Sequence, residues 1–170
     1  YYELNGERVL FADELETNED GEIVIGNLPL RTYYLVEVEA PAGYEIDERE
    51  QMIEVTEPYG TEGFVYETKF TNTKVKTDIS VSKVWEDSEN QDGSRPESIA
   101  VQLLADGEAA GDAVTLSEDD DWTYTWTDLD EYQSNGETID YTVEEVDIPE
   151  GYESNTGTDE DGNIILTNTH

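Results

Sequence analysis

Short stretches in which apolar and polar residues alternate recur along the whole chain. They are rich in Val, Ile, Thr and aromatic residues, which is typical of β-strands. Turn dipeptides such as Asp20-Gly21, Asp92-Gly93 and Asn135-Gly136 separate them at spacings too short for crossover helices. The pattern therefore predicts an all-β protein built from small sandwiches. The predicted strands cover residues 23–25, 33–38, 64–70, 79–85, 99–104, 122–126, 139–146 and 164–166.

An internal repeat divides the chain into two related parts. Residues 33–45 align without gaps with residues 141–153, and a Thr-Asn-Thr triplet follows each copy, at 71–73 and at 167–169. Self-similarity of this kind indicates domains in tandem. We expect one domain over residues 1–75 and a second over residues 76–170, joined by a short linker around residues 74–77.

In the second part, side-chain alternation places three polar groups on apolar faces. Every second side chain of a strand points to the same side of the sheet, so parity along the strand predicts burial. Lys83, Glu145 and Asn168 are predicted to point inward, whereas Glu144 falls on the opposite face. Their apolar companions on the same faces are, in turn, Val81 and Trp85, Tyr141 and Val143, and Ile164 and Leu166.

Two interpretations of these inward groups are open. A lone buried ammonium or carboxylate is costly, so such groups are either paired or neutral. The first interpretation is a buried, hydrogen-bonded triad. The second is a reaction in which a neutral Lys83 amine attacks the side-chain carbonyl of Asn168, while protonated Glu145 polarises that carbonyl and transfers protons. Loss of ammonia would leave a Lys–Asn isopeptide bond.

Six sequence blocks of the second part occur in a distinctive order. They are VSKVW (81–85), NQDGSRP (90–96), VQLLADG (101–107), WTY (122–124), YTVEE (141–145) and TNTH (167–170). This series resembles the collagen-adhesin B-type repeat, also called the prealbumin-like pilin domain, of Gram-positive surface proteins. The resemblance implies an Ig-like or prealbumin-like β-sandwich whose first and last strands are joined by an isopeptide bond. Here the bond would join Lys83 to Asn168, with Glu145 as the catalytic acid.

The first part resembles the same family through fewer blocks: NEDG (18–21), NL (27–28), LVE (35–37), APAGY (40–44) and FTNT (70–73). By analogy, Glu37 is its catalytic acid and Asn72 its acceptor. Lys69 cannot be the donor, because it lies on the strand of Asn72 and on the opposite face. The family's donor strand would lie upstream of Tyr1. We therefore expect the first domain to lack its N-terminal strand, and either an upstream segment or a strand from another chain to complete it.

Charge narrows the range of partners. The chain has 170 residues, with 44 Asp and Glu against 8 Lys and Arg, and a net charge of −36. Such a surface repels phosphate backbones and anionic lipids, so neither nucleic acid nor a membrane is expected as a partner. Lys83 and Arg95 are the only bases of residues 77–170. The absence of Cys and the single His argue against disulfide scaffolds, Cys-type zinc sites and His-dependent nucleophilic catalysis.

Acidic clusters at residues 119–121 and 159–161 lack the spacing of a calcium-binding loop, so neither a metal site nor a cofactor is expected. The expected function is that of a structural stalk or spacer in an extracellular adhesin or pilin-like protein, anchored to the cell wall or part of a pilus, with neighbouring domains of the same protein as partners. Each domain would complete one autocatalytic turnover and would not be an enzyme.

The alternative is an adhesive module that binds a host extracellular protein or glycan. Exposed aromatic residues would form its recognition surface, with Tyr59, Tyr132 and the strand that carries Trp122, Tyr124 and Trp126 as candidates. Parity places the last three on one face. A core position for that face would favour the stalk, whereas an exposed position would favour the adhesive module.

Overall fold

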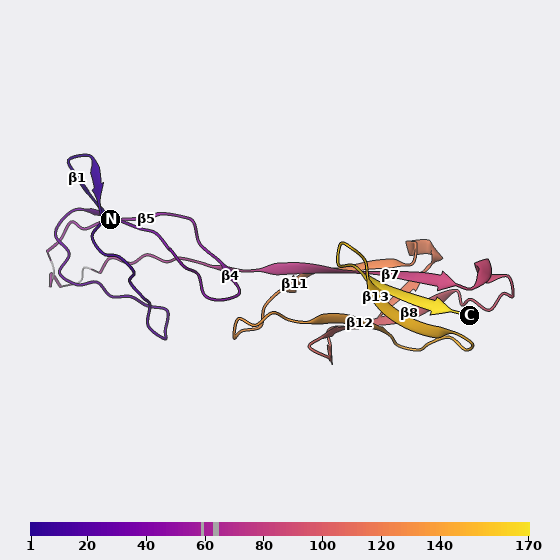
Figure 1. Cartoon of the computed structure of the whole chain (residues 1–170). Helices are drawn as coiled ribbons and strands as arrows, with labels where there is room; N and C mark the ends of the chain where they lie inside the picture. Colours follow the sequence, from indigo (N-terminus) through magenta and orange to yellow (C-terminus); the bar gives the residue numbers. More distant parts are fainter. Residues whose placement is uncertain (59, 63–64) are drawn as a thin grey trace. The chain divides into compact units, whose positions relative to one another are not determined.

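The computed structural model describes residues 1–58, 60–62 and 65–170 (Figure 1). Its regular elements are β-strands and two single-turn 3-10 helices, η1 (Ser88–Asn90) and η2 (Glu118–Asp120), which confirms the all-β class. None of the helices in these residues is long and apolar enough to cross a membrane. The chain forms two compact units, Tyr1–Lys74 and Val75–His170. Tyr59 and Phe64, named among the predictions, lie outside the described residues.

One sheet of the second unit contains the first and last strands of that unit as direct neighbours. Its order is β11-β7-β14-β13, with β11 at Thr123–Asp130, β7 at Lys76–Glu86, β14 at Ile164–Thr169 and β13 at Glu153–Thr158. β7 and β14 run parallel, in a register that pairs Lys83 with Leu166 and Trp85 with Asn168. The other pairs in this sheet are antiparallel.

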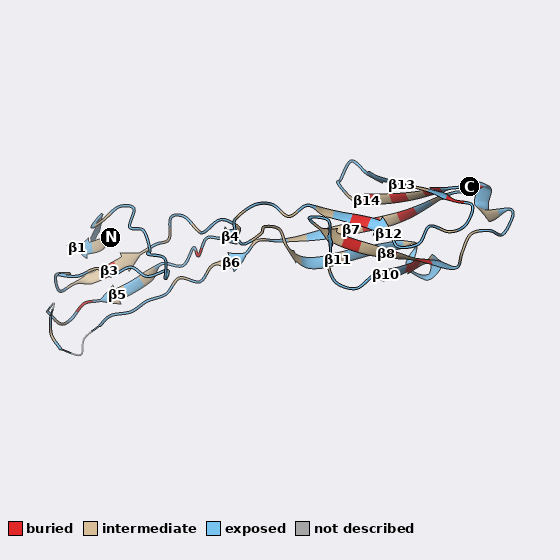
Figure 2. Cartoon of the chain, turned by 90° about the horizontal axis from the view of Figure 1, so that it is seen from below, coloured by how far each residue is buried: buried red, intermediate tan, exposed pale blue. Residues whose placement is uncertain are grey.

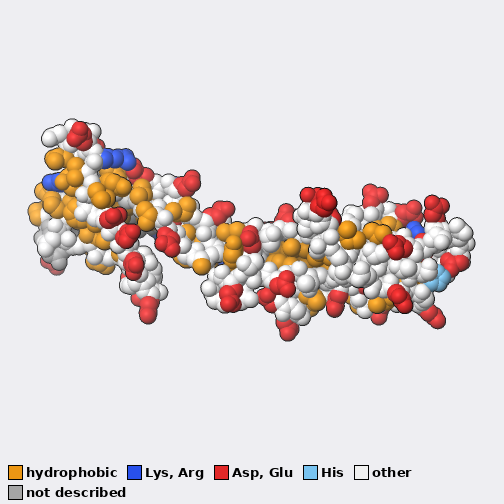
Figure 3. All heavy atoms as spheres, in the orientation of Figure 1, with side chains coloured by type: hydrophobic (Ala, Val, Ile, Leu, Met, Phe, Trp, Pro, Cys, Tyr) orange, Lys and Arg blue, Asp and Glu red, His pale blue; other side chains and the backbone are white. Residues whose placement is uncertain are grey.

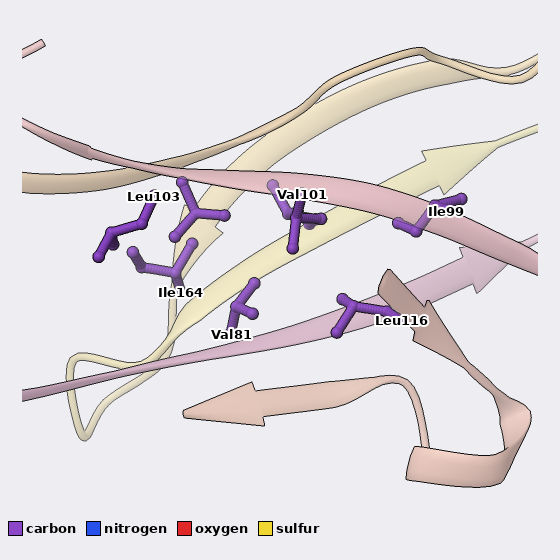
Figure 4. Packing of buried hydrophobic residues seen from close by; sticks show 8 residues of the cluster. Val81, Ile99, Val101, Leu103, Leu116 and Ile164 are labelled. Carbon is purple, nitrogen blue, oxygen red and sulfur yellow. The ribbon is translucent and has the colours of Figure 1, made fainter. Parts of the chain in front are cut away.

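A second sheet faces the first and completes the sandwich. Its order is β10-β8-β12, with β10 at Val114–Ser117, β8 at Ser98–Ala105 and β12 at Tyr141–Glu145, and the short β9 (Glu108–Ala109) also pairs with β8. Apolar side chains from both sheets meet in one core (Figure 4). Figure 2 shows the buried positions gathered on the strands of this unit. The core residues are Val81, Ile99, Val101, Leu103, Leu116, Val143, Ile164 and Leu166.

The predicted strands agree well with the second unit. Residues 79–85, 99–104, 139–146 and 164–166 overlap β7, β8, β12 and β14, and their buried residues follow the predicted parity. The prediction for 122–126 is one residue early, because Trp122 has a φ of 58° and β11 begins at Thr123. β13 escaped prediction because its sequence, ESNTGT, has no apolar alternation and its residues are mostly exposed.

The first unit has shorter strands. Its sheet has the order β2-β1-β3-β5, with β2 at Glu7–Val9, β1 at Tyr2–Leu4, β3 at Thr32–Leu35 and β5 at Gln51–Glu54. All of its pairs are antiparallel. A separate pair joins β4 (Tyr44–Glu45) to β6 (Thr73–Lys74). Of the strand predicted over 33–38, only residues up to Leu35 lie in β3.

Two strand predictions in the first unit are wrong. Residues 23–25 form no strand, and neither do the described residues 65–70. Val24 is 93% exposed, so its apolar side chain has no core to enter. Among the described residues of this unit, Tyr33 and Val55 are the buried hydrophobic ones, and Figure 3 shows many apolar side chains at its surface. The sequence of this unit contains alternating apolar residues, but few of these residues are buried in the described structure.

Candidate functional site

Lys83, Glu145 and Asn168 lie together in the core of the second unit. The side chains of Lys83 and Glu145 are 0% and 2% exposed, and Asn168 is fully buried. Lys83 Nζ lies 4.0 Å from Glu145 Oε2, and Asn168 Nδ2 donates to Glu145 Oε1 at 2.9 Å. The inward placement predicted from parity is thus confirmed for all three residues. One carboxylate contacts both the amine and the carboxamide.

The strand arrangement explains why these side chains meet. Lys83 and Asn168 come from β7 and β14, which are adjacent strands of one sheet. Glu145 ends β12 in the facing sheet, so its carboxylate reaches them across the core. Glu144 is exposed on the opposite face of β12. The site therefore bridges the two sheets at a point where the core contains several polar groups.

Burial changes the protonation of Lys83. Desolvation lowers the pKa of Lys83 from 10.5 to about 8, against the opposing effect of the negative charges of Glu145 and Asp87. The amine also donates to the backbone carbonyls of Val84, at 3.2 Å, and Leu166, at 3.4 Å. With this pKa, about a tenth of Lys83 is the neutral amine at pH 7, which is the form that acts as a nucleophile, and this fraction is far larger than for an unperturbed lysine.

The carboxamide of Asn168 is only half satisfied. Its Oδ1 is buried without a hydrogen-bond partner among the described residues, although its Nδ2 binds Glu145. Glu145 Oε2 accepts a further hydrogen bond from Ser154 Oγ at 3.2 Å. A buried carbonyl oxygen without a partner lowers the stability of the fold. Oδ1 could accept a hydrogen bond if the carboxamide rotated by half a turn about its Cβ–Cγ bond.

Aromatic rings cover the amine. The centroid of the Trp85 ring lies 4.3 Å from Lys83 Nζ, and Trp85 packs edge to face against Trp122 and Tyr152, each at 5.2 Å. These rings exclude water from the site and so maintain the desolvation of Lys83.

A second polar cluster borders these rings. Asp87, whose side chain is fully buried, accepts hydrogen bonds from Arg95 and from the hydroxyl of Tyr152. Sequence reasoning noted Arg95 as one of two bases and did not connect it to Asp87. The signal that could have found the pair is a lone arginine in a stretch dense with acids, because such a base has many carboxylates within reach and a charge that is buried is usually paired.

The first unit brings together Glu37 and Asn72. Asn72 Nδ2 donates to Glu37 Oε2 at 2.6 Å and to the carbonyl of Glu45 at 3.1 Å, while the backbone N–H of Asp47 also donates to Glu37 Oε2. Both side chains are partly buried and lie just outside the strands, after β3 and before β6. Lys69 is exposed. The acid and amide of the repeat are thus in contact here as well.

The aromatic candidates divide between core and surface. Trp122 and Trp126 pack against the core of the second unit, whereas Tyr124 is 41% exposed and its ring lies 4.9 Å from that of Trp126. Tyr132 is half-buried. No group of three or more Asp, Glu or His side chains in the described part of the chain is arranged to hold a metal ion. The face that carries the two tryptophans is therefore mainly a core face.

Comparisons with known proteins agree with this geometry. Residues 79–169 match the Cna protein B-type domain, and residues 1–74 match the prealbumin-like fold domain. A collagen adhesin of Staphylococcus aureus is 43% identical over 105 residues, which cover 61% of this chain and 9% of that protein. The chain thus spans a small part of the length of this relative.

Solved structures give the same picture. A single B repeat unit of the collagen binding surface protein of S. aureus has a TM-score of 0.52 and 33% identity, covering 71% of this chain and 73% of the other. Two B repeat units of that protein have a TM-score of 0.52 and 27% identity, covering 89% of this chain and 45% of the other. Since the B-type model spans more than half of the chain, this protein belongs to the Cna B-type domain family, with a prealbumin-like domain as its first unit.

Proposed function

We propose that the two units are stalk or spacer domains of a Gram-positive cell-surface adhesin or pilin-like protein, and that the second unit is stabilised by an autocatalytic isopeptide bond. The observation that carries the proposal is the buried Glu145 carboxylate in contact with both Lys83 and Asn168. The similarity to B repeat units of a surface protein supports an extracellular location, at the cell wall or in a pilus.

The chemistry follows from the three side chains. Neutral Lys83 Nζ attacks Cγ of Asn168, and the Glu145 carboxylate, which lies beside Nζ and accepts a hydrogen bond from Asn168 Nδ2, takes up a proton from Nζ. The proton lost by Nζ passes through Glu145 to Nδ2, the Cγ–Nδ2 bond breaks, and ammonia leaves. An Nζ–Cγ amide remains and Glu145 regains its starting state. The nucleophile is consumed, so the reaction runs once in each molecule and the protein is not a turnover enzyme.

Such a bond would join the first strand of the unit to the last. Treated as a disulfide that closes the chain from residue 83 to residue 168, it would stabilise the unit by about 4 to 5 kcal/mol. Because β7 and β14 are neighbours, tension that enters at residue 83 would leave at residue 168 through covalent bonds. The strands between them would carry little load, which suits a spacer that holds an adhesive tip away from a cell.

For the first unit, we propose the same chemistry with a donor from elsewhere. Glu37 would act as the acid and Asn72 as the acceptor, and their direct hydrogen bond supports this pairing. We take this first domain as residues 1–75. A lysine-bearing strand, from an upstream segment or from another chain, would complete it and cover part of its exposed apolar surface. The second domain then comprises residues 76–170.

The mass of the purified, denatured chain tests the proposal. We expect a deficit of one ammonia relative to the sequence, and a branched peptide containing Lys83 and Asn168 after digestion. Glu145→Gln should fold and keep the full mass, whereas Glu144→Gln, its exposed neighbour on the same strand, should show the deficit. A wild-type chain of full mass, or a cross-linked Glu145→Gln, would contradict the proposed reaction.

The adhesive alternative has weaker support. It requires an exposed aromatic strip that would bind a host protein or glycan, yet Trp122 and Trp126 pack against the core and leave Tyr124 as the exposed member of that face. A single exposed ring among acidic neighbours is common on protein surfaces. The stalk is therefore the better-supported function.

A further inference from the structure

The buried cluster around Asp87 lies next to the reactive lysine. Asp87 directly follows β7, and its carboxylate accepts hydrogen bonds from Arg95 Nε at 2.8 Å, Arg95 Nη2 at 2.5 Å and the Tyr152 hydroxyl at 3.0 Å. The N–H of Asn90 donates to the same carboxylate. The arginine is itself held in place, because its backbone N–H donates to the side chain of Asn90. The ion pair is thus closed and well ordered.

The indole of Trp85 lies close to both cations. Lys83 Nζ is 4.3 Å from the centroid of this ring, and the guanidinium carbon of Arg95 is 5.5 Å from it. Tyr152, which binds Asp87, packs against the same indole. Trp85 therefore connects the ion pair to the reactive amine.

The charges around Lys83 come from a few groups. Glu145 from β12 and Asp87 after β7 both favour its ammonium form, and Asn168 from β14 is uncharged. Glu145 is required for the chemistry, but Asp87 contacts neither the amine nor the amide in the contacts described above. An uncompensated Asp87 would favour the protonated, unreactive form of Lys83 more strongly, and Arg95 supplies the compensating charge.

We propose that Arg95 is a positioning residue for the cross-link: by pairing with Asp87 and packing beside Trp85, it cancels a buried negative charge near Lys83 and keeps the amine free to react. This inference rests on the proposed isopeptide bond. It adds Arg95 as a residue that acts on Lys83 through Asp87. It also accounts for the only other base in a stretch of the chain that has 26 acids, residues 77–170.

The test is the pH dependence of cross-linking in the full chain. A chain made with photocaged lysine at position 83 is unlinked. The cage is removed by light in denaturant, the chain is diluted into native buffers between about pH 6 and about pH 10, and ammonia loss is followed by mass. For the wild-type sequence we expect the rate to rise with pH to a plateau, with a midpoint near the Lys83 pKa of about 8.

Arg95→Gln should move this midpoint upward by about one pH unit. The reaction then becomes about tenfold slower at neutral pH and approaches the wild-type rate on the alkaline plateau. The double variant Asp87→Asn with Arg95→Gln removes both charges and should restore the wild-type midpoint. Lys76→Gln is the matched control, because it removes one positive charge from the same unit at a partly exposed ion pair with Asp130. Its midpoint should not move.

Three results would overturn the inference. Arg95→Gln could slow the reaction equally at every pH, which is the signature of a merely structural role, or leave the midpoint unchanged. The double variant could keep the raised midpoint. If Arg95→Gln does not regain native tryptophan fluorescence, Arg95→Lys and the double variant decide the matter, since both should keep the wild-type midpoint. A wild-type chain that loses no ammonia at any pH would instead refute the cross-link itself. The wild-type result therefore separates a failure of the proposed bond from a failure of the role proposed for Arg95.

Discussion

At the scale of single residues, Lys83 is the group whose environment departs most from that of a surface lysine. Its amine is buried between the carboxylate of Glu145 and the indole of Trp85, and its pKa is lowered to about 8 mainly by desolvation. The folded chain therefore loses this proton at a lower pH than the unfolded chain does. A difference in proton binding of this kind makes stability depend on pH.

We predict that an unlinked variant becomes more stable as pH rises from about 8 to 10.5, since over this range the unfolded chain holds a proton that the folded chain has released. Asn168→Ala provides the unlinked chain, and Asn168→Ala with Lys83→Met is the control without the titrating group. The difference between their unfolding free energies in urea should change by at most about 1.4 kcal/mol per pH unit. Parallel pH curves for the two variants would contradict a lowered pKa of Lys83.

Sequence reasoning reached the three core polar residues but missed the cluster beside them. Parity finds Lys83 because a strand has a fixed period of two. Asp87 and Arg95 are joined through a turn in which Ser88, Glu89 and Asn90 all have positive φ. No periodic rule describes such a segment, so their pairing becomes visible only when the turn is folded.

At the scale of elements, a strand needs a partner as well as a pattern. Residues 23–25 have the pattern and form no strand, whereas β13 has none and is a strand because it pairs along its whole length with β14. Sequence periodicity reports which face of a segment can be buried. It does not report whether a neighbour is in place, so strands inside the sandwich were predicted better than those at its edges.

β10 offers a test of burial in a strand that was not predicted. Leu116 is fully buried in the core, and its neighbour Thr115 is exposed on the other face. In a Glu145→Gln background, which is expected to be unlinked, Leu116→Ala should lower the unfolding free energy by about 2 to 5 kcal/mol and Thr115→Ala by less than about 1 kcal/mol. Urea denaturation measures both. Equal losses would mean that β10 does not pack as described.

At the scale of the whole molecule, the sequence alone predicts the net charge and the internal repeat. It does not predict how much the hydrophobic cores of the two units differ in size. The second unit has eight buried hydrophobic residues in one cluster, while the described part of the first has Tyr33 and Val55. Both units contain many apolar residues, and composition alone does not show which of them find a neighbour.

The net charge of −36 leads to a further prediction. Like charges repel more strongly in the compact state, and salt screens this repulsion over about 8 Å at physiological ionic strength. Raising the NaCl concentration should therefore raise the melting temperature, as measured by circular dichroism. Choline chloride should act equally well, because screening does not depend on the identity of the monovalent cation. An effect confined to sodium would indicate specific ion binding.

The parallel pairing of β7 with β14 also sets an order of events in time. One strand opens the second unit and the other closes it, so the proposed reaction centre cannot assemble until the final strand has been synthesised and has docked. A truncated or misfolded chain would never bring Asn168 to Lys83 and would stay unsealed, open to proteases. The bond would thus form only in chains whose second unit has folded, and it would persist afterwards. Cross-linking would follow folding and would not compete with it.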